Sequence, residues 1–142
     1  NISNAPINQM VAARFLKEGG YRKHMRRVRQ KLQVQVEALR ASVLKHFPAG
    51  TKVTRPDGGL FVWVELPDGL DADLLYRKAV QAGILFAPGT LFSIHNRYHH
   101  HLRLSSGTWN ERVEKAIAHL GRLCARMRNG RADDRVSRLA VG

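Results

Sequence analysis

The sequence predicts an α+β fold, a two-layer sandwich in which helices cover one face of a small, mostly antiparallel sheet. Three observations predict it. Apolar residues recur at helical spacing over residues 21–46, they alternate as in strands over 60–66 and 101–105, and turn residues separate these segments. The 142 residues suit one domain, and no apolar run approaches the ~18 residues that a membrane helix needs.

The first two predicted segments are helices. Residues 8–18 form a short helix that ends at Gly19 and Gly20, and residues 21–46 form a helix of about 39 Å. The apolar stripe of this long helix comprises Tyr21, Met25, Val28, Leu32, Val36, Leu39, Val43 and Phe47. Its opposite face is basic and carries Arg22, Lys23, Arg26, Arg27, Arg29, Lys31, Arg40 and Lys45. Such a face is typical of solvent exposure, and less often binds acidic partners.

Two strands joined by a turn follow. Residues 52–55 favour a short strand, the stretch PDGG has turn chemistry, and 60–66 favour a strong strand, which together indicate an antiparallel hairpin. Alternation assigns Phe61, Trp63 and Glu65 to one face of the second strand.

The second half of the chain alternates helix and strand. Asp71 is placed to cap a helix that runs to about Gln81 and that Gly83 closes. Short strands are expected at 84–87 and 101–105, around an irregular loop. A capping box from Thr108 to Glu111 predicts a last helix to about residue 127. Residues 128–142 are polar and Arg-rich without periodicity, which predicts a disordered tail.

The charge balance is the unusual feature of the composition. There are 24 Lys and Arg against 11 Asp and Glu, a net charge of +13. This balance favours a nucleic acid or another acidic partner, or a larger protein whose remainder is acidic, yet no nucleic-acid-binding motif matches. The single cysteine, Cys124, continues an apolar stripe and is expected to be a core thiol; a cytoplasmic location is the default expectation.

Histidines form the first candidate site. His99 and His101 would share one face of a strand, and His95 lies nearby in a loop. Imidazoles bind zinc, copper or nickel, but no carboxylate or cysteine accompanies these histidines at ligand spacing. We therefore expect no physiological metal site, although metal can bind there adventitiously.

Arg103 and a glycine pair form the second candidate site. Arg103 lies between core leucines on a strand, where a buried guanidinium needs a partner. The pattern alone favours an ion pair with a carboxylate such as Glu65, and the alternative is a bidentate fork for the carboxylate of a substrate. Gly58 and Gly59 indicate a turn, and glycines before a strand also permit close approach of a ligand.

Five stretches occur in an order that resembles a known family. They are YRKHMRRVRQ, PDGGLFVWVELP, GILFAPGTLFS, HLRLSSG and the closing amphipathic helix. Over residues 1–127 the chain resembles the C-terminal small domain of fold-type I, pyridoxal-phosphate (PLP)-dependent class I/II aminotransferases. It is most similar to the aminotransferase-like half of MocR-type transcription regulators, which carry a GntR-type winged helix-turn-helix upstream.

The resemblance implies a division of labour. The large domain of the family holds PLP through a Schiff-base lysine, and the small domain closes over an amino-acid substrate or effector. In the small domain, an arginine within an L-R-L motif grips the α-carboxylate, and Arg103 matches it. Gly58 and Gly59 would line the active site. The stretch that carries the Schiff-base lysine in the family is absent here, so the chain is expected to bind no PLP and to be inactive alone.

The resemblance also implies a domain organisation and partners. Residues 1–20 would link to a missing large PLP domain, 21–127 would form the small domain, and 128–142 the tail. The chain begins with Asn1 rather than Met, as a piece of a longer protein would. The expected partners are that large domain, a second subunit of a homodimer, and DNA through a missing N-terminal domain only. The alternatives are a free-standing aminotransferase and a stand-alone basic nucleic-acid-binding domain.

Overall fold

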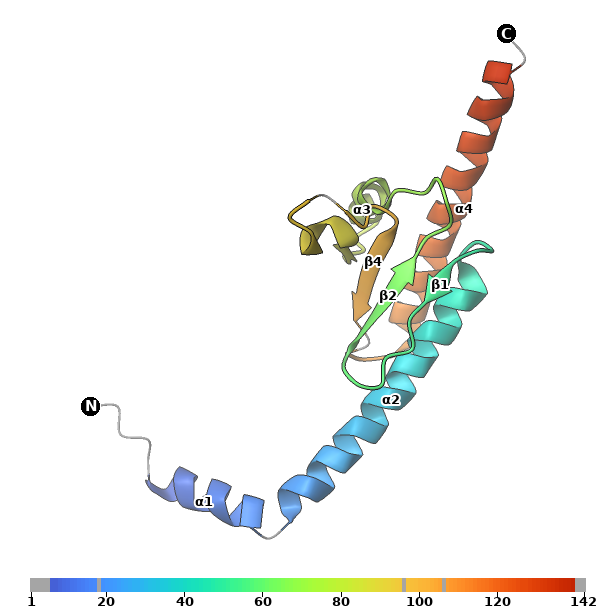
Figure 1. Ribbon diagram of the computed structural model, residues 1–142. Coiled ribbons are helices and arrows are strands. Elements are labelled where there is room, and N and C mark those ends of the chain that lie inside the picture. The colour runs from blue at the N-terminus through green and yellow to red at the C-terminus, as the bar shows by residue number, and fades with distance from the viewer. Residues whose placement is uncertain (1–5, 18, 96, 106, 140–142) are drawn as a thin grey trace.

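The computed structural model describes residues 6–17, 19–95, 97–105 and 107–139, and confirms the α+β class (Figure 1). The four strands form one sheet with the order β1-β2-β4-β3, in which every neighbouring pair is antiparallel. The elements in chain order are α1 (Pro6–Lys17), α2 (Gly20–His46), β1 (Lys52–Val53), β2 (Phe61–Glu65), α3 (Ala72–Gln81), β3 (Ala87–Pro88), the 3-10 turn η1 (Gly89–Phe92), β4 (His101–Ser105) and α4 (Glu111–Leu139).

The core lies between the sheet and the helices. Val62 and Val64 of β2 and Leu102 and Leu104 of β4 are buried, because alternate strand residues point to one face. The helices α2 and α4 lie side by side against that face (Figure 1). They contribute Val36, Leu39, Val43, Ile117, Leu120 and Cys124 to the core. The other face of the sheet carries Phe61, Trp63, His101 and Arg103, in agreement with the predicted alternation.

The long helix α2 has two halves with different surroundings. Its C-terminal half is buried from Val36 to Val43, whereas its N-terminal half extends beyond the sheet towards α1 (Figure 1). The apolar stripe continues along this extension, where Tyr21 is 45% exposed, and onto α1, where Met10 is 72% exposed. The predicted apolar stripe is therefore continuous along α2, but other described residues bury only its C-terminal half.

Two local expectations need correction, and a third is confirmed. The strand predicted at 84–87 is confined to Ala87–Pro88, because the amide of Ile84 still bonds to Ala79 O at the end of α3. Asn110, not Thr108, caps α4: its side-chain oxygen accepts a hydrogen bond from the amide of Val113 at 3.0 Å. The predicted cap of α3 is confirmed, since Asp71 accepts from the amides of Asp73 and Leu74.

The helix α4 is longer than the sequence predicts. It continues to Leu139, so the expectation of a disordered tail over 128–142 is wrong for residues 128–139, and 140–142 lie outside the described residues. Periodicity was a poor guide here because a helix that leaves the core needs no apolar stripe. Arginine, alanine and leucine have high intrinsic helix propensity, and no proline interrupts the segment. None of the described helices is long and apolar enough to cross a membrane.

Candidate ligand-binding site

Arg103 lies at the centre of the sheet. It stands on β4, directly opposite Trp63 of β2 on one side and Ala87 of β3 on the other. Strand alternation turns its side chain away from the core, where it is half-buried. A central strand flanked by two others fixes the backbone of Arg103, so the position of the side chain is set by the sheet rather than by a loop.

Two aromatic rings hold the guanidinium of Arg103. Its central carbon lies 4.3 Å from the centre of the Phe61 ring and 4.3 Å from the centre of the Phe92 ring. Both distances are within the range of cation–π attraction. Trp63 in turn packs edge-on against Phe92, with ring centres 5.2 Å apart. The clamp restricts the orientation of the guanidinium plane, and the N–H groups make no hydrogen bond to a described residue.

Arg103 has no acidic partner within the part of the chain that the structure describes. Glu65 accepts a hydrogen bond from Lys52 Nζ at 2.9 Å, and this bond lowers the pKa of the Glu65 carboxyl. The Glu65–Arg103 ion pair that the pattern favoured is therefore wrong. The register explains it: Glu65 stands opposite His101, whereas Arg103 stands opposite Trp63. The guanidinium makes no hydrogen bond or ion pair among the described residues.

The structure does not bring Gly58 and Gly59 into one cavity with Arg103. Arg103 borders a cavity of about 400 Å³ between β4, residues 83–87 and α4. The two glycines line a separate cavity of about 810 Å³ against α2, together with Arg29 and Glu37. Gly59 has a φ of 97°, which supports the predicted turn. A role for the pair in lining the Arg103 site stays a prediction.

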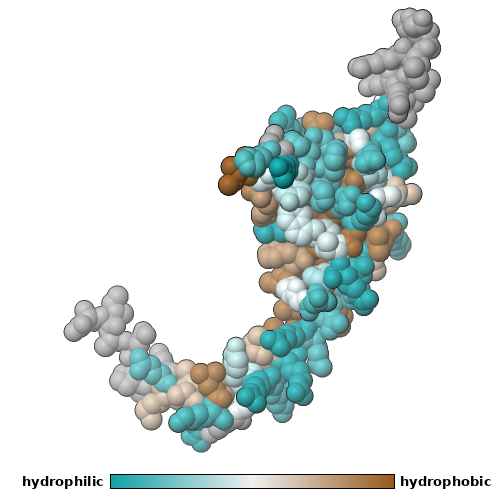
Figure 2. Space-filling model, in the orientation of Figure 1, coloured by the Kyte–Doolittle hydropathy of each residue, from teal (hydrophilic) through white to brown (hydrophobic). Residues whose placement is uncertain are grey.

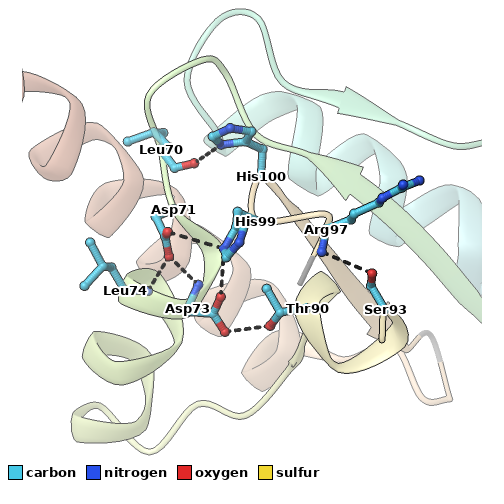
Figure 3. Close-up of polar contacts among 9 residues, drawn as sticks. All are labelled: Leu70, Asp71, Asp73, Leu74, Thr90, Ser93, Arg97, His99 and His100. Atoms are coloured by element: carbon cyan, nitrogen blue, oxygen red, sulfur yellow. Dashed lines mark hydrogen bonds and ion pairs between the residues drawn. The ribbon is translucent and has the colours of Figure 1, made fainter. Parts of the chain in front are cut away.

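The histidines have carboxylate neighbours that sequence spacing did not reveal. His99 Nδ1 lies 3.6 Å from Asp73 Oδ2 and 3.9 Å from Asp71 Oδ2, as Figure 3 shows. The statement that no carboxylate accompanies these histidines is thus wrong, because the start of α3 folds back beside the loop before β4. The sequence signal that could have indicated this contact is the helix-capping residue Asp71 followed closely by a second aspartate, Asp73.

These acidic groups are already engaged by the protein. Asp71 Oδ1 caps α3, and Asp73 Oδ1 accepts a hydrogen bond from the hydroxyl of Thr90 at 2.8 Å (Figure 3). The three ligand atoms of Asp71, Asp73 and His99 lie within 4.8 Å of one another. Hydrogen bonding accounts for the placement of both carboxylates without an ion. His101 instead packs against Trp63, and His95 is an exposed loop residue.

Cys124 is a core thiol, as predicted. It is buried in the apolar stripe of α4, and this burial raises the pKa of the thiol to about 12. A thiol with such a pKa stays protonated at ordinary pH, as a structural core cysteine does.

Comparison with known proteins identifies the family. The sequence model of the family "Aminotransferase class I and II" matches residues 1–120. The chain belongs to this family. A solved relative, the α-aminoadipate aminotransferase LysN of Thermus thermophilus in complex with N-(5'-phosphopyridoxyl)-L-leucine, is 35% identical and superposes with a TM-score of 0.72. The match covers 84% of this chain and 31% of LysN.

Curated relatives fall into two groups. The 2-aminoadipate transaminase of Thermus thermophilus is 36% identical over 82% of this chain and 29% of its own length. The HTH-type transcriptional regulator YjiR of Escherichia coli is 34% identical over 83% of this chain and 25% of its own length. The chain thus spans under a third of these aminotransferase-family relatives and is a partial domain of such a protein. Its relatives thus include both aminotransferases and HTH-type transcriptional regulators.

The family and the LysN complex imply PLP in the full-length parent. The described residues of this chain do not fit that cofactor by themselves. Neither the Arg103 cavity nor the Gly58–Gly59 cavity is lined by a lysine that could attach PLP.

Proposed function

We propose that this chain is the C-terminal small domain of a MocR/GntR-type transcription regulator. It closes over an amino-acid ligand, and Arg103 holds the ligand's α-carboxylate. The observation that carries the proposal is the aromatic clamp: a guanidinium fixed by Phe61 and Phe92, without an acidic partner among the described residues. Arginine so placed has its N–H groups available for an incoming anion.

The chemistry of the clamp suits a carboxylate. A planar guanidinium can donate two parallel hydrogen bonds to one carboxylate, which fixes both the position and the plane of the ligand. Phe61 and Phe92 limit rotation of the guanidinium, so less conformational entropy is lost when the ligand binds. The rest of the parent would hold PLP and present it to the oriented amino acid.

The experiment is an amino-acid titration of the full-length parent, followed by the absorbance of its PLP. We expect Arg103→Ala to weaken amino-acid binding at least tenfold, since a charge-assisted bidentate contact is lost. The spectrum without amino acid should be unchanged. Arg103→Lys should restore the affinity only partly, because an ammonium group cannot form the bidentate fork.

A matched ligand isolates the carboxylate. The amine that lacks the α-carboxylate should bind the wild-type protein and Arg103→Ala equally well. Equal affinity of both proteins for the amino acid itself would remove Arg103 from the site.

A free-standing aminotransferase is the second candidate, and the 36% identity to 2-aminoadipate transaminase favours it. The two candidates differ in the parent upstream of this chain. A winged helix-turn-helix there would select the regulator, and its absence beside a PLP-lysine segment would select the enzyme. In both cases this chain would contribute the carboxylate contact. A stand-alone nucleic-acid-binding domain is not needed to explain residues 1–120, which the family accounts for.

A further inference from the structure

The N-terminal half of α2 carries an exposed band of positive charge that the carboxylate site does not use. We call this band the cationic face; it comprises Arg22, Lys23, Arg26, Arg27, Arg29 and Lys31. All six residues are exposed, and Figure 2 shows a hydrophilic surface along this extension of the molecule. No Asp or Glu occurs between residues 19 and 36, so this half of the helix supplies no counter-charge of its own.

Among the described residues, Arg29 of the cationic face lines a cavity together with the acids Glu37 and Asp57. The nearest acid on the helix, Glu37, is occupied by Arg40 at 2.9 Å and by Arg55 at 3.1 Å. None of the six cations forms an ion pair with a described residue. Their charges therefore add to the positive end of the helix dipole, and α2 begins without a side-chain cap on its free amide groups.

The arrangement costs helix stability. Lys23, Arg27 and Lys31 stand four residues apart in succession, and each pair of like charges at this spacing destabilises a helix by about 0.2–0.5 kcal/mol. This column lies on the side of α2 opposite the apolar stripe, so it does not face the core. The column therefore does not stabilise the helix, and its charges are exposed to an acidic partner.

We infer that the cationic face binds the phosphate backbone of duplex DNA without reading its sequence. Burying six unpaired cations against an apolar domain surface would be costly, so the partner must bring negative charge. From Lys23 to Lys31 the helix rises about 12 Å, which spans three to four base pairs at about 3.4 Å each. Four of the six cations are arginines, whose planar fork suits phosphate oxygens.

The choice of DNA over an acidic protein rests on the proposed function, because a regulator parent would bring DNA to this face. The relatives that are HTH-type transcriptional regulators favour it, among them YjiR and YdcR of Escherichia coli. The cationic face would then strengthen DNA binding by the whole parent, whereas sequence would be read elsewhere. Arg103 takes no part in this contact.

The test uses the 142-residue chain and a fluorescent duplex of about 24 base pairs with arbitrary sequence, titrated at several salt concentrations. The triple variant Lys23→Gln, Arg27→Gln, Lys31→Gln removes the column and keeps good helix formers. Log affinity falls with log salt, and we expect the steepness of this slope to decrease by about 2–3 in the variant. Each lost phosphate contact removes about 0.9 from the slope. Affinity at moderate salt should drop at least tenfold.

Two further variants serve as controls. The triple variant Arg112→Gln, Arg122→Gln, Arg126→Gln removes the same charge from exposed positions of α4 and should keep the wild-type slope. The charge-preserving variant Lys23→Arg, Arg27→Lys, Lys31→Arg should also keep it, which separates loss of charge from loss of folding.

Three outcomes would overturn the inference. The first is an unchanged slope in the glutamine variant of α2, and the second is an equal loss in the α4 variant, which would indicate net charge alone. The third is binding of labelled polyglutamate as tightly as the duplex, which would assign the face to an acidic protein. Failure here is distinct from failure of the proposed function, because the latter is read from amino-acid affinity in the parent.

Discussion

The guanidinium of Arg103 lies 4.3 Å from the ring centre of Phe92, although the two residues are separated by the loop that joins η1 to β4. Phe92, which belongs to η1 and not to the sheet, therefore helps to orient the guanidinium of Arg103 on β4. This relationship would make η1 part of the proposed ligand site, and it leads to a prediction about how Arg103 is positioned rather than about its charge.

Phe92→Leu should weaken amino-acid binding by the full-length parent about threefold to tenfold, because one side of the cation–π clamp is lost while the charge remains. The loss should be smaller than that of Arg103→Ala. Leu91→Ala is the matched control: Leu91 is the neighbouring residue on η1 and is 72% exposed. Amino-acid titration checks both variants, and equal losses for Phe92→Leu and Leu91→Ala would contradict a specific clamp.

Gly121 lies where α4 closely approaches the C-terminal end of α2. A Cβ at this position would lie within van der Waals overlap of His46 O, a backbone atom that cannot move alone. We expect Gly121→Ala to destabilise the isolated chain by about 2–3 kcal/mol in urea unfolding. Gly130→Ala on the same helix meets nothing within 4 Å and should be neutral or slightly stabilising. Similar stabilities for the two variants would show that the helices can separate without cost.

Asp71 joins the cap of α3 to the loop that holds His99. Asp71→Ala should lower the free energy of unfolding by about 1 kcal/mol, because the amides of Asp73 and Leu74 lose their acceptor. Asp71→Asn keeps an acceptor oxygen and should retain most of the stability. Chemical denaturation at neutral pH compares the variants, and a loss as large for asparagine as for alanine would assign the effect to charge instead of capping.

The buried thiol of Cys124 should make the free energy of unfolding fall at alkaline pH. Burial raises the pKa of its thiol to about 12, above the unfolded value near 9.0. The unfolded chain therefore loses this proton first, and above pH 9 stability falls with pH by up to about 1.4 kcal/mol per unit. Below pH 9 the thiol adds no pH dependence. Unfolding measured from pH 8 to 10.5 should show a shallower decline in Cys124→Ala than in wild type; parallel curves would contradict the assignment.

The sequence predicted what depends on local patterns. Alternation placed Val62 and Arg103 on opposite faces, and apolar spacing placed Val36 and Ile117 in the core. Capping chemistry located Asp71 correctly. These features depend on neighbours within one turn or one strand, so a single sequence contains the necessary information.

Long-range relationships could not be predicted from the pattern. The approach of Asp73 to His99 depends on how α3 folds back on the loop before β4, and the ring of Phe92 reaches Arg103 through tertiary packing. The register between β2 and β4 decides that Glu65 meets Lys52 rather than Arg103. Whether Arg103 grips a carboxylate stays a prediction, with its test in the full-length parent.

The two halves of α2 give the helix the geometry of a lever. Its C-terminal half is fixed in the core, and its free half, residues 20–35, is about 24 Å long at 1.5 Å per residue. A tilt of about 5° at the sheet would move the free end by about 2 Å. Any small rotation of this domain against its surroundings is therefore magnified at Gly19 and α1, far from the residues that caused it.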